Sequence, residues 1–372
     1  MQLKPIDSGN TFGKDTMVRE LLRPLTELLN TEGANEIYIN KPHEVIVECG
    51  GITHTHPMPN LTMNKLMSLA NAIATYTDQN INATNPILSA ILPDKERIQI
   101  IVPPAVESDC VSITIRKPFP QIKSLEEYEA EGAFSKYLWP IPEGLDQRLD
   151  DLKLVERKMI SALNENRFSE FIRLAVRSKK NIAVVGDTGS GKTTFMKTIC
   201  QDIPRHERLV TIEDVRELFL PKHDNCVHLI YSKGGQGLAK VTPSDLISSC
   251  MRMKPNRVLL AELRGAEAFD FLKLLTTGHS GSITSFHAES CALAGERYVF
   301  MSKEHDQAAI YDEHALKRLV ALTIDIVIHI EAETIHDAED NIVRVDRYIS
   351  EVQYNPIHKL QEKYGAAKLH KA

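Results

Sequence analysis

Residues 181–200 read NIAVVGDTGSGKTTFMKTIC, and they set the architecture of the chain. Ile182 to Val185 form a short apolar run of the kind found in buried parallel strands. The run is followed by GDTGSGKT (186–193), which matches G-x-x-x-x-G-K-[ST] without interruption, and then by the expected opening of a helix. Strand, glycine loop and helix in this order are the context that a phosphate-binding loop requires. The stretch therefore predicts an α/β fold that binds a nucleoside triphosphate.

The residue types of the loop explain how it would bind phosphate. Glycines let successive backbone N–H groups point into one concavity, and the following helix adds the positive end of its dipole. Lys192 is expected to carry its charge to the β- and γ-phosphates, and the Thr193 hydroxyl is expected to ligate Mg²⁺. The expected nucleotide-binding residues are Gly186, Asp187, Thr188, Gly189, Ser190, Gly191, Lys192, Thr193 and Thr194.

Length and composition limit the class of protein. A chain of 372 residues exceeds one ordinary core and suggests two domains. The net charge of −6 provides no global basic field, so stable direct binding of DNA is not expected. No apolar run approaches the roughly 18 residues of a membrane span, and the start of the chain has no signal-peptide pattern. Six scattered cysteines without a C-x-x-C pair indicate reduced thiols, as in a cytoplasmic protein.

Periodicity divides the chain into four parts. Residues 1–120 are expected to form a small N-terminal α/β domain, with helical spacing over 17–29 and 61–76 and a β-hairpin over 36–48. Residues 121–158, Pro-rich and charged, are expected to be an interdomain linker. In residues 159–355 strands alternate with helices, which favours a parallel sheet covered on both faces. Residues 356–372 are expected to be a polar tail.

Acidic residues follow two of the predicted strands. Glu213 and Asp214 end the strand at 209–212, and Glu262 ends the strand at 257–261. Ligands of open parallel sheets lie outside the carboxyl ends of the strands, where the phosphate loop also lies. We therefore expect these acids to face the nucleotide, its metal ion and the attacking water.

Two histidines, His279 and His287, flank the strand expected at 282–286. Cys291 follows His287 by four positions, but no second cysteine pair or H-x-x-x-H supports a zinc site. Beside a nucleotide, the two imidazoles are candidates for sensing the γ-phosphate or positioning water.

Four stretches, taken together, resemble the Walker A, Asp, Walker B and His boxes of the secretion ATPase superfamily, in that order: GDTGSGKT (186–193), TIEDVRE (211–217), RVLLAELRG (257–265) and GHSGSITSFHAES (278–290). Three further stretches resemble the N-terminal pattern of the traffic ATPases of type IV secretion and conjugation systems: EIYINKPHEVIVE (36–48), ERIQIIVPPAV (96–106) and SITIRKP (112–118).

The resemblance implies a RecA-like phosphate-loop ATPase domain with a smaller N-terminal α/β domain. It further implies a homo-hexameric ring, peripheral on the cytoplasmic face of the bacterial inner membrane and in contact with other secretion components. ATP hydrolysis with Mg²⁺ would move the N-terminal domains and power assembly of the apparatus or translocation of DNA or protein.

The resemblance also implies roles for single residues. Glu262 would be the general base, while Glu213 and Asp214 would support the metal, bound by Thr193, and the water. His279 and His287 would respond to the γ-phosphate. Two N-terminal arginines, Arg116 and Arg97, would reach the γ-phosphate as the domains close, with Arg252 and Arg264 as further candidates.

Three other interpretations stay open at this stage. A pilus motor or type II secretion ATPase would carry a tetracysteine zinc module or a retraction-motor element, and the sequence has neither. A RecA-like motor acting on DNA is disfavoured by the net charge of −6. A regulatory nucleotide-binding scaffold without turnover is disfavoured by Glu262.

Overall fold

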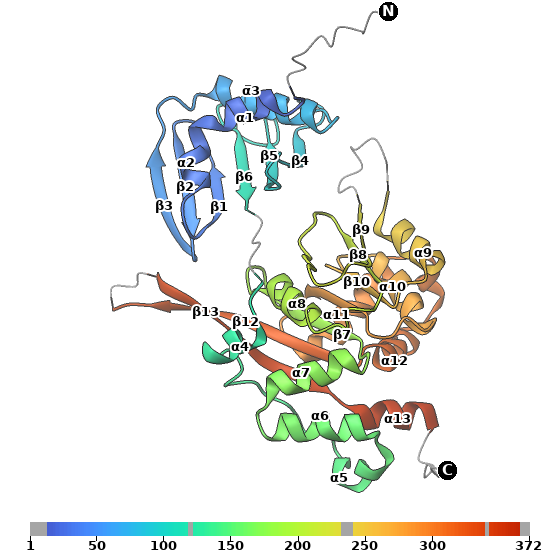
Figure 1. The fold of residues 1–372 in the computed structure, drawn as a ribbon. Coiled ribbons are helices and arrows are strands. Elements are labelled where there is room, and N and C mark those ends of the chain that lie inside the picture. The colour runs from blue at the N-terminus through green and yellow to red at the C-terminus, as the bar shows by residue number, and fades with distance from the viewer. Residues whose placement is uncertain (1–12, 118–121, 232–240, 339–341, 365–372) are drawn as a thin grey trace, which may run out of the picture. The chain divides into compact units, whose positions relative to one another are not determined.

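The computed structural model describes residues 13–117, 122–231, 241–338 and 342–364 (Figure 1). These residues fall into two compact units, one formed by 13–117 and the other by the remainder. No helix among the described residues has both the length and the apolar character needed to cross a membrane.

The first unit is built on a six-stranded antiparallel sheet with the order β3-β2-β1-β6-β5-β4. Alternate residues of its strands, such as Ile37 and Ile39 or Ile98 and Ile100, are buried against the helices on one face. The helix expected over 17–29 is interrupted at Pro24, whose ring does not fit a helix interior. The elements are α1 (Thr16–Leu22), η1 (Arg23–Leu25), α2 (Thr26–Leu29), β1 (Ala34–Ile39), β2 (Glu44–Cys49), β3 (Ile52–Pro57), α3 (Met63–Tyr76), β4 (Ile87–Ile91), β5 (Arg97–Ile101) and β6 (Ser112–Arg116).

The second unit contains a seven-stranded sheet with the order β13-β12-β7-β11-β10-β8-β9. All neighbouring pairs are parallel except the β12–β13 hairpin. The strands are β7 (Ile182–Gly186), β8 (Leu209–Glu213), β9 (Cys226–Ile230), β10 (Arg257–Leu260), β11 (Ile283–His287), β12 (Ile326–His336) and β13 (Ile342–Tyr354). This arrangement confirms the α/β fold of the phosphate-loop ATPase type that the sequence predicts.

Helices cover both faces of this sheet and form two separate cores. Along β7, Ile182 and Val184 belong to the core with α6, α7 and α8, whereas Ala183 and Val185 belong to the core with α9 to α12. This alternation explains why the strand is apolar throughout. The helices are α6 (Leu154–Asn164), α7 (Phe168–Arg177), α8 (Lys192–Cys200), α9 (Pro243–Met253), α10 (Glu267–Thr276), α11 (Cys291–Lys303) and α12 (Glu313–Thr323), with η4 at Asp306–Ile310.

The segment expected to be an interdomain linker, 121–158, belongs to the second unit from Ile122 onward. It contains α4 (Leu125–Ala130), α5 (Leu145–Arg148), η2 (Leu149–Asp151) and the start of α6. Its apolar side chains are buried in the core with α7 and α8, which a linker could not achieve. The expectation was therefore wrong over most of its length, and residues 118–121 lie outside the described residues.

The C-terminal residues also differ from the expected polar tail. A helix, α13 (Pro356–Tyr364), begins there, and Ile357 is buried in the core of the second unit. Residues 365–372 lie outside the described part of the chain.

Candidate active site

The phosphate loop leaves β7 at a point where only glycine fits. A Cβ atom on Gly186 would lie 2.2 Å from the carbonyl oxygen of Ile330 on β12, and Gly186 has a φ of +152°. Gly189 and Gly191 also have positive φ values, so the loop curls before α8 begins. Asp187, Thr188 and Gly189 are exposed on the loop, whereas Ser190 is buried.

Lys192 is the first residue of α8, and its ammonium group is folded back into the loop. Its Nζ donates to the carbonyl oxygens of Gly186 (3.0 Å) and Asp187 (2.6 Å). The buried Ser190 hydroxyl has no hydrogen-bond partner among the described residues. A buried donor without a partner and a cation on carbonyl oxygens both fit a loop that receives phosphate oxygens. Thr193 and Thr194, half-buried, follow in the first turn of α8.

A line of polar and charged side chains connects Lys192 to the acids at the same edge of the sheet. The Lys192 Nζ lies 3.4 Å from Nδ1 of His287, and Nε2 of His287 lies 3.2 Å from Oε1 of Glu262. Arg264 then joins Glu262 (Nη2 to Oε2, 2.6 Å) to Asp214 (Nη1 to Oδ2, 3.1 Å). Walker A, Walker B, His-box and Asp-box residues therefore meet at one place, because β7, β8, β10 and β11 all end at this edge.

The surroundings of His287 favour its neutral form. Burial, followed by the positive charge of Lys192, lowers the pKa of His287 below its ordinary value. In the neutral form, Nδ1 would accept from the Lys192 ammonium, which can only donate, and Nε2 would carry the proton that faces Glu262. Burial lowers the pKa of Arg264, but its hydrogen bond with Glu262 and the charge of Asp214 outweigh this and raise it.

Glu213 does not take the position that the sequence predicts. Its side chain is fully buried, and one oxygen accepts the N–H groups of Glu217 and Leu218, both at 2.8 Å. The other oxygen accepts the hydroxyl of Thr211 (2.9 Å) and lies 3.6 Å from His228. Thr211 and Glu213 share a face of β8, so this carboxylate points into the core and secures the loop after the strand. Asp214, one residue later, is the acid that meets Arg264.

His279 is likewise separated from the phosphate loop. It precedes β11, whereas His287 ends the strand opposite Gly186. A strand rises about 3.3 Å per residue, so the two histidines are at least about 13 Å apart along the sheet. His279 therefore lies near the amino edge, where its Nδ1 is 3.2 Å from the Thr277 hydroxyl. Arg252 is exposed in the last turn of α9.

The two N-terminal arginines lie side by side in the first unit. Arg97 on β5 and Arg116 on β6 are directly opposite each other, and Glu36 on β1 is opposite Arg116 from the other side. Arg116 forms an ion pair with Glu36, with Nε 2.7 Å from the carboxylate. These side chains form a cross-strand row on one face of the sheet.

Sequence reasoning missed one residue at the loop. Arg347 on β13 donates from Nε to the carbonyl oxygen of Gly189 at 3.0 Å. No sequence signal pointed to it, because β13 carries alternating polar residues and belongs to none of the four boxes.

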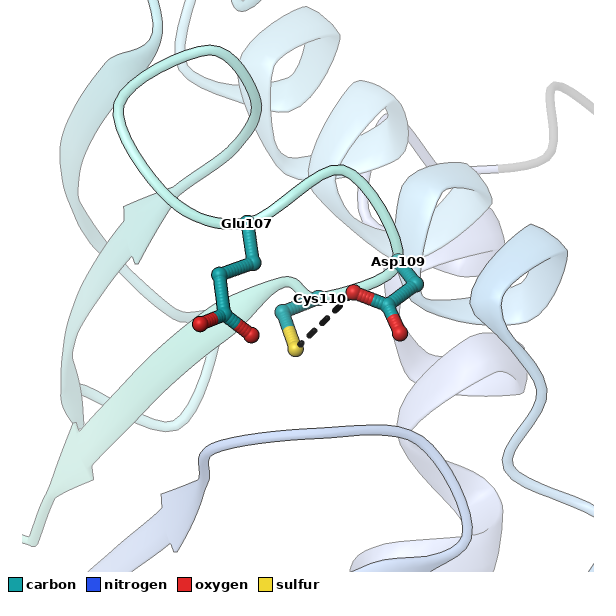
Figure 2. Close-up of side chains that lie close together, drawn as sticks. All are labelled: Glu107, Asp109 and Cys110. Atoms are coloured by element: carbon teal, nitrogen blue, oxygen red, sulfur yellow. Dashed lines mark hydrogen bonds between the residues drawn. The ribbon is translucent and has the colours of Figure 1, made fainter.

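One group of side chains has metal-ligand spacing among the described residues, on the exposed loop between β5 and β6. Figure 2 shows Glu107, Asp109 and Cys110, with the Cys110 thiol turned toward Asp109. Burial and the charges of Asp109 and Glu107 raise the pKa of this thiol, which opposes the thiolate that a metal would bind.

Comparisons with known proteins show the family of the chain. The family described as "Type II/IV secretion system protein" matches residues 149–356. The type IV secretion system protein VirB11 of Brucella suis biovar 1 is 42% identical over 337 residues, covering 90% of this chain and 89% of that protein. The type IV secretion system protein PtlH of Bordetella pertussis is 38% identical, covering 87% of this chain and 93% of that protein.

Solved structures give the same result. The crystal structure of the VirB11 ATPase from the Brucella suis type IV secretion system in complex with sulphate is 40% identical, with a TM-score of 0.51 over 94% of this chain and 98% of that one. The pilus retraction motor PilT with bound ADP aligns with a TM-score of 0.54 over 92% of this chain and 85% of that one, at 15% identity. At that identity the second likeness concerns the fold alone.

Proposed function

The chain belongs to the type II/IV secretion system protein family and is a type IV secretion ATPase, and from this premise we propose how its residues bind and hydrolyse ATP to power secretion. The observation that carries the proposal is the line from Lys192 through His287 to Glu262, because it joins the phosphate-binding cation to a carboxylate suited to activate water. Identities of 38–42% to type IV proteins, against 15% to the pilus motor, favour type IV secretion over a pilus-type role.

ATP would bind with its phosphates on the loop from Gly186 to Thr194. The Lys192 ammonium would exchange the carbonyl oxygens of Gly186 and Asp187 for β- and γ-phosphate oxygens, and the buried Ser190 hydroxyl would gain an acceptor. The N-terminus of α8 adds its dipole at the same point. Thr193 would hold Mg²⁺ with Asp214 or Glu262 through water, and the ion when bound would neutralise charge on the phosphoryl oxygens.

Glu262 would be the general base. Its carboxylate is held from one side by His287 and from the other by Arg264, so it is oriented before substrate arrives. It would accept a proton from the water that attacks the γ-phosphorus, yielding ADP and inorganic phosphate. His287 contacts both Lys192 and Glu262, so movement of the Lys192 ammonium onto phosphate would change the hydrogen bonding of the Glu262 carboxylate through His287. We assign the support of metal and water to Asp214 in place of Glu213, which is engaged in the core.

Further positive charge is needed at the γ-phosphoryl group during hydrolysis, and we propose that arginines of the first unit supply it. Arg264 is occupied by two carboxylates, so it is poorly suited to the terminal phosphate. Arg97 and Arg116 lie opposite each other on β5 and β6, and the family likeness implies that N-terminal arginines at these positions reach the γ-phosphate. We assign them the stabilisation of charge on the γ-phosphoryl group.

The quaternary and cellular parts of the proposal rest on the family likeness. The chain would form a homo-hexameric ring, peripheral on the cytoplasmic face of the inner membrane, that works with other secretion components. Conjugative DNA transfer and protein export are both compatible with the residues of the site.

The test is phosphate release by Glu262→Gln and Lys192→Ala, with nucleotide binding measured in parallel. Glu262→Gln is expected to bind ATP and to turn over at least about a hundredfold more slowly, because it loses general-base chemistry. Lys192→Ala is expected to lose binding. Normal turnover by Glu262→Gln would refute the base, and normal binding by Lys192→Ala would refute the site.

A further inference from the structure

The β12–β13 hairpin extends past the sheet at the phosphate loop. β12 pairs with β7 from Ile326 to Ile330, which lies opposite Gly186. Beyond that point residues 331–336 of β12 pair with 342–348 of β13, and we call these residues the outer arm (Figure 1). The arm is mostly exposed, and in the described residues its strands pair only with each other.

Arg347 connects this arm to the phosphate loop. Its Nε donates to the Gly189 carbonyl oxygen at 3.0 Å. Its Cδ packs beside Gly191: a Cβ atom added to Gly191 would lie 3.4 Å from it. The side chain therefore flanks two of the glycines that give the loop its curl. Arg344, three residues earlier, points to the opposite face of the strand and pairs with Asp346.

The bond fixes the orientation of one peptide group in the loop. In a trans peptide the C=O and the following N–H point in opposite directions. Holding the Gly189 oxygen outward thus keeps the N–H of Ser190 turned inward, where it lies 3.3 Å from the Asp187 oxygen. If this peptide rotated, the carbonyl oxygen would face the phosphates and repel them. Glycine residues make such rotation easy, so the hydrogen bond from Arg347 is needed to keep this peptide in one orientation.

We propose that Arg347 is a positioning residue for the phosphate loop and that, through it, nucleotide binding orders the outer arm. The inference rests on the proposed nucleotide site. A charge-assisted bond prepares the loop for phosphate, so its effect falls mainly on binding. Conversely, a loop fixed by bound nucleotide holds the Arg347 bond closed and restrains the strand that carries it.

The experiment compares three variants of the full chain. Arg347→Met keeps an unbranched stem beside Gly191 but removes the charge and the donor. Arg347→Lys keeps the charge and a hydrogen-bond donor group, but not the guanidinium geometry. Arg344→Met makes the same change on the other face of the same strand and serves as the matched control.

We expect Arg347→Met to raise the KM for ATP about tenfold with kcat within about twofold, as for loss of one charge-assisted bond. Arg347→Lys should recover most of the affinity, and Arg344→Met should match the wild type. Hydrogen exchange of residues 342–348 should slow on addition of a non-hydrolysable ATP analogue with Mg²⁺ in the wild type and in Arg344→Met, but not in Arg347→Met.

An unchanged KM in Arg347→Met, or arm protection equal to that of the wild type, would overturn the inference. A fall in kcat at constant KM would also overturn it, by making Arg347 catalytic. Lys192→Ala distinguishes failure of the inference about Arg347 from failure of the proposed nucleotide site, because normal nucleotide binding by Lys192→Ala would refute the site itself.

Discussion

Replacing Glu213 by Gln tests whether this carboxylate holds the loop after β8 or takes part in hydrolysis. Gln keeps the volume and can accept the N–H groups of Glu217 and Leu218, but the charge is lost. A hydrogen bond to a charged group contributes about 1.5–3 kcal/mol, against about 1 kcal/mol for a neutral one. Over these two bonds and the Thr211 hydroxyl, we expect the free energy of unfolding to fall by about 2–4 kcal/mol.

The pH dependence of the free energy of unfolding gives a second measure of how much the Glu213 carboxylate contributes to stability. Contacts with Cys226 and with Glu213 raise the pKa of His228 to about 9. A folded-state pKa above the unfolded value means that the stabilisation is complete below about pH 6.5 and is lost as pH rises through about 9. We expect the free energy of unfolding of the wild type to fall by about 1–3 kcal/mol as pH rises across this window, and that of Glu213→Gln to fall by less.

Urea unfolding at pH 6, 7.5 and 9 measures both effects, and phosphate release measures hydrolysis at a temperature where the variant stays folded. Turnover of Glu213→Gln should remain within about tenfold of the wild type, far above that of Glu262→Gln. If stability is unchanged within about 0.5 kcal/mol while turnover falls a hundredfold, Glu213 acts in the chemistry and our assignment of its role is wrong.

Two further experiments test the packing that supports the site. Gly186→Ala should abolish ATP binding or prevent folding, because its Cβ would lie 2.2 Å from the Ile330 oxygen. Gly295→Ala is the control: it lies in α11 with no atom within 4 Å of the added Cβ, and it should match or exceed the stability of the wild type. Equal behaviour of the two variants in thermal unfolding and in nucleotide binding would contradict this expectation. Arg257→Met should lower the free energy of unfolding by about 3–5 kcal/mol, because the buried Glu207 loses bonds of 2.7 and 3.1 Å. Adding Glu207→Gln should recover part of that loss in urea unfolding, and strict additivity of the two changes would argue against the pair.

Local patterns predicted much of the second unit. The helix Pro243–Met253 begins at a start signal that is readable in the sequence, because Thr242 and Asp245 form a capping box and Pro243 occupies the first position. The phosphate loop and the edge where its partner acids gather follow from the order of strands and the carboxyl-end rule. Family likeness and fold class, both stated from the sequence, are confirmed by the comparisons and by the sheet order.

Features set by tertiary packing were missed. The segment from Ile122 carries buried residues such as Tyr128 and Phe134, but the charged residues around them and the later Pro140 and Pro142 hide any periodicity. β13 alternates polar residues whose partners are supplied by β12, so neither the strand nor Arg347 stood out. Glu213 and Asp214 are adjacent in sequence, but Glu213 is the last residue of β8 and points into the core, whereas Asp214 follows the strand and meets Arg264.

The first described residues of the second unit are fixed to the helix that follows the phosphate loop. The Lys123 carbonyl accepts the Thr198 hydroxyl of α8, and the Tyr128 ring packs edge-on against Phe195 of the same helix. The phosphate loop and the first residues of the second unit therefore share one support, and a shift of the helix that opens at Lys192 would displace both together.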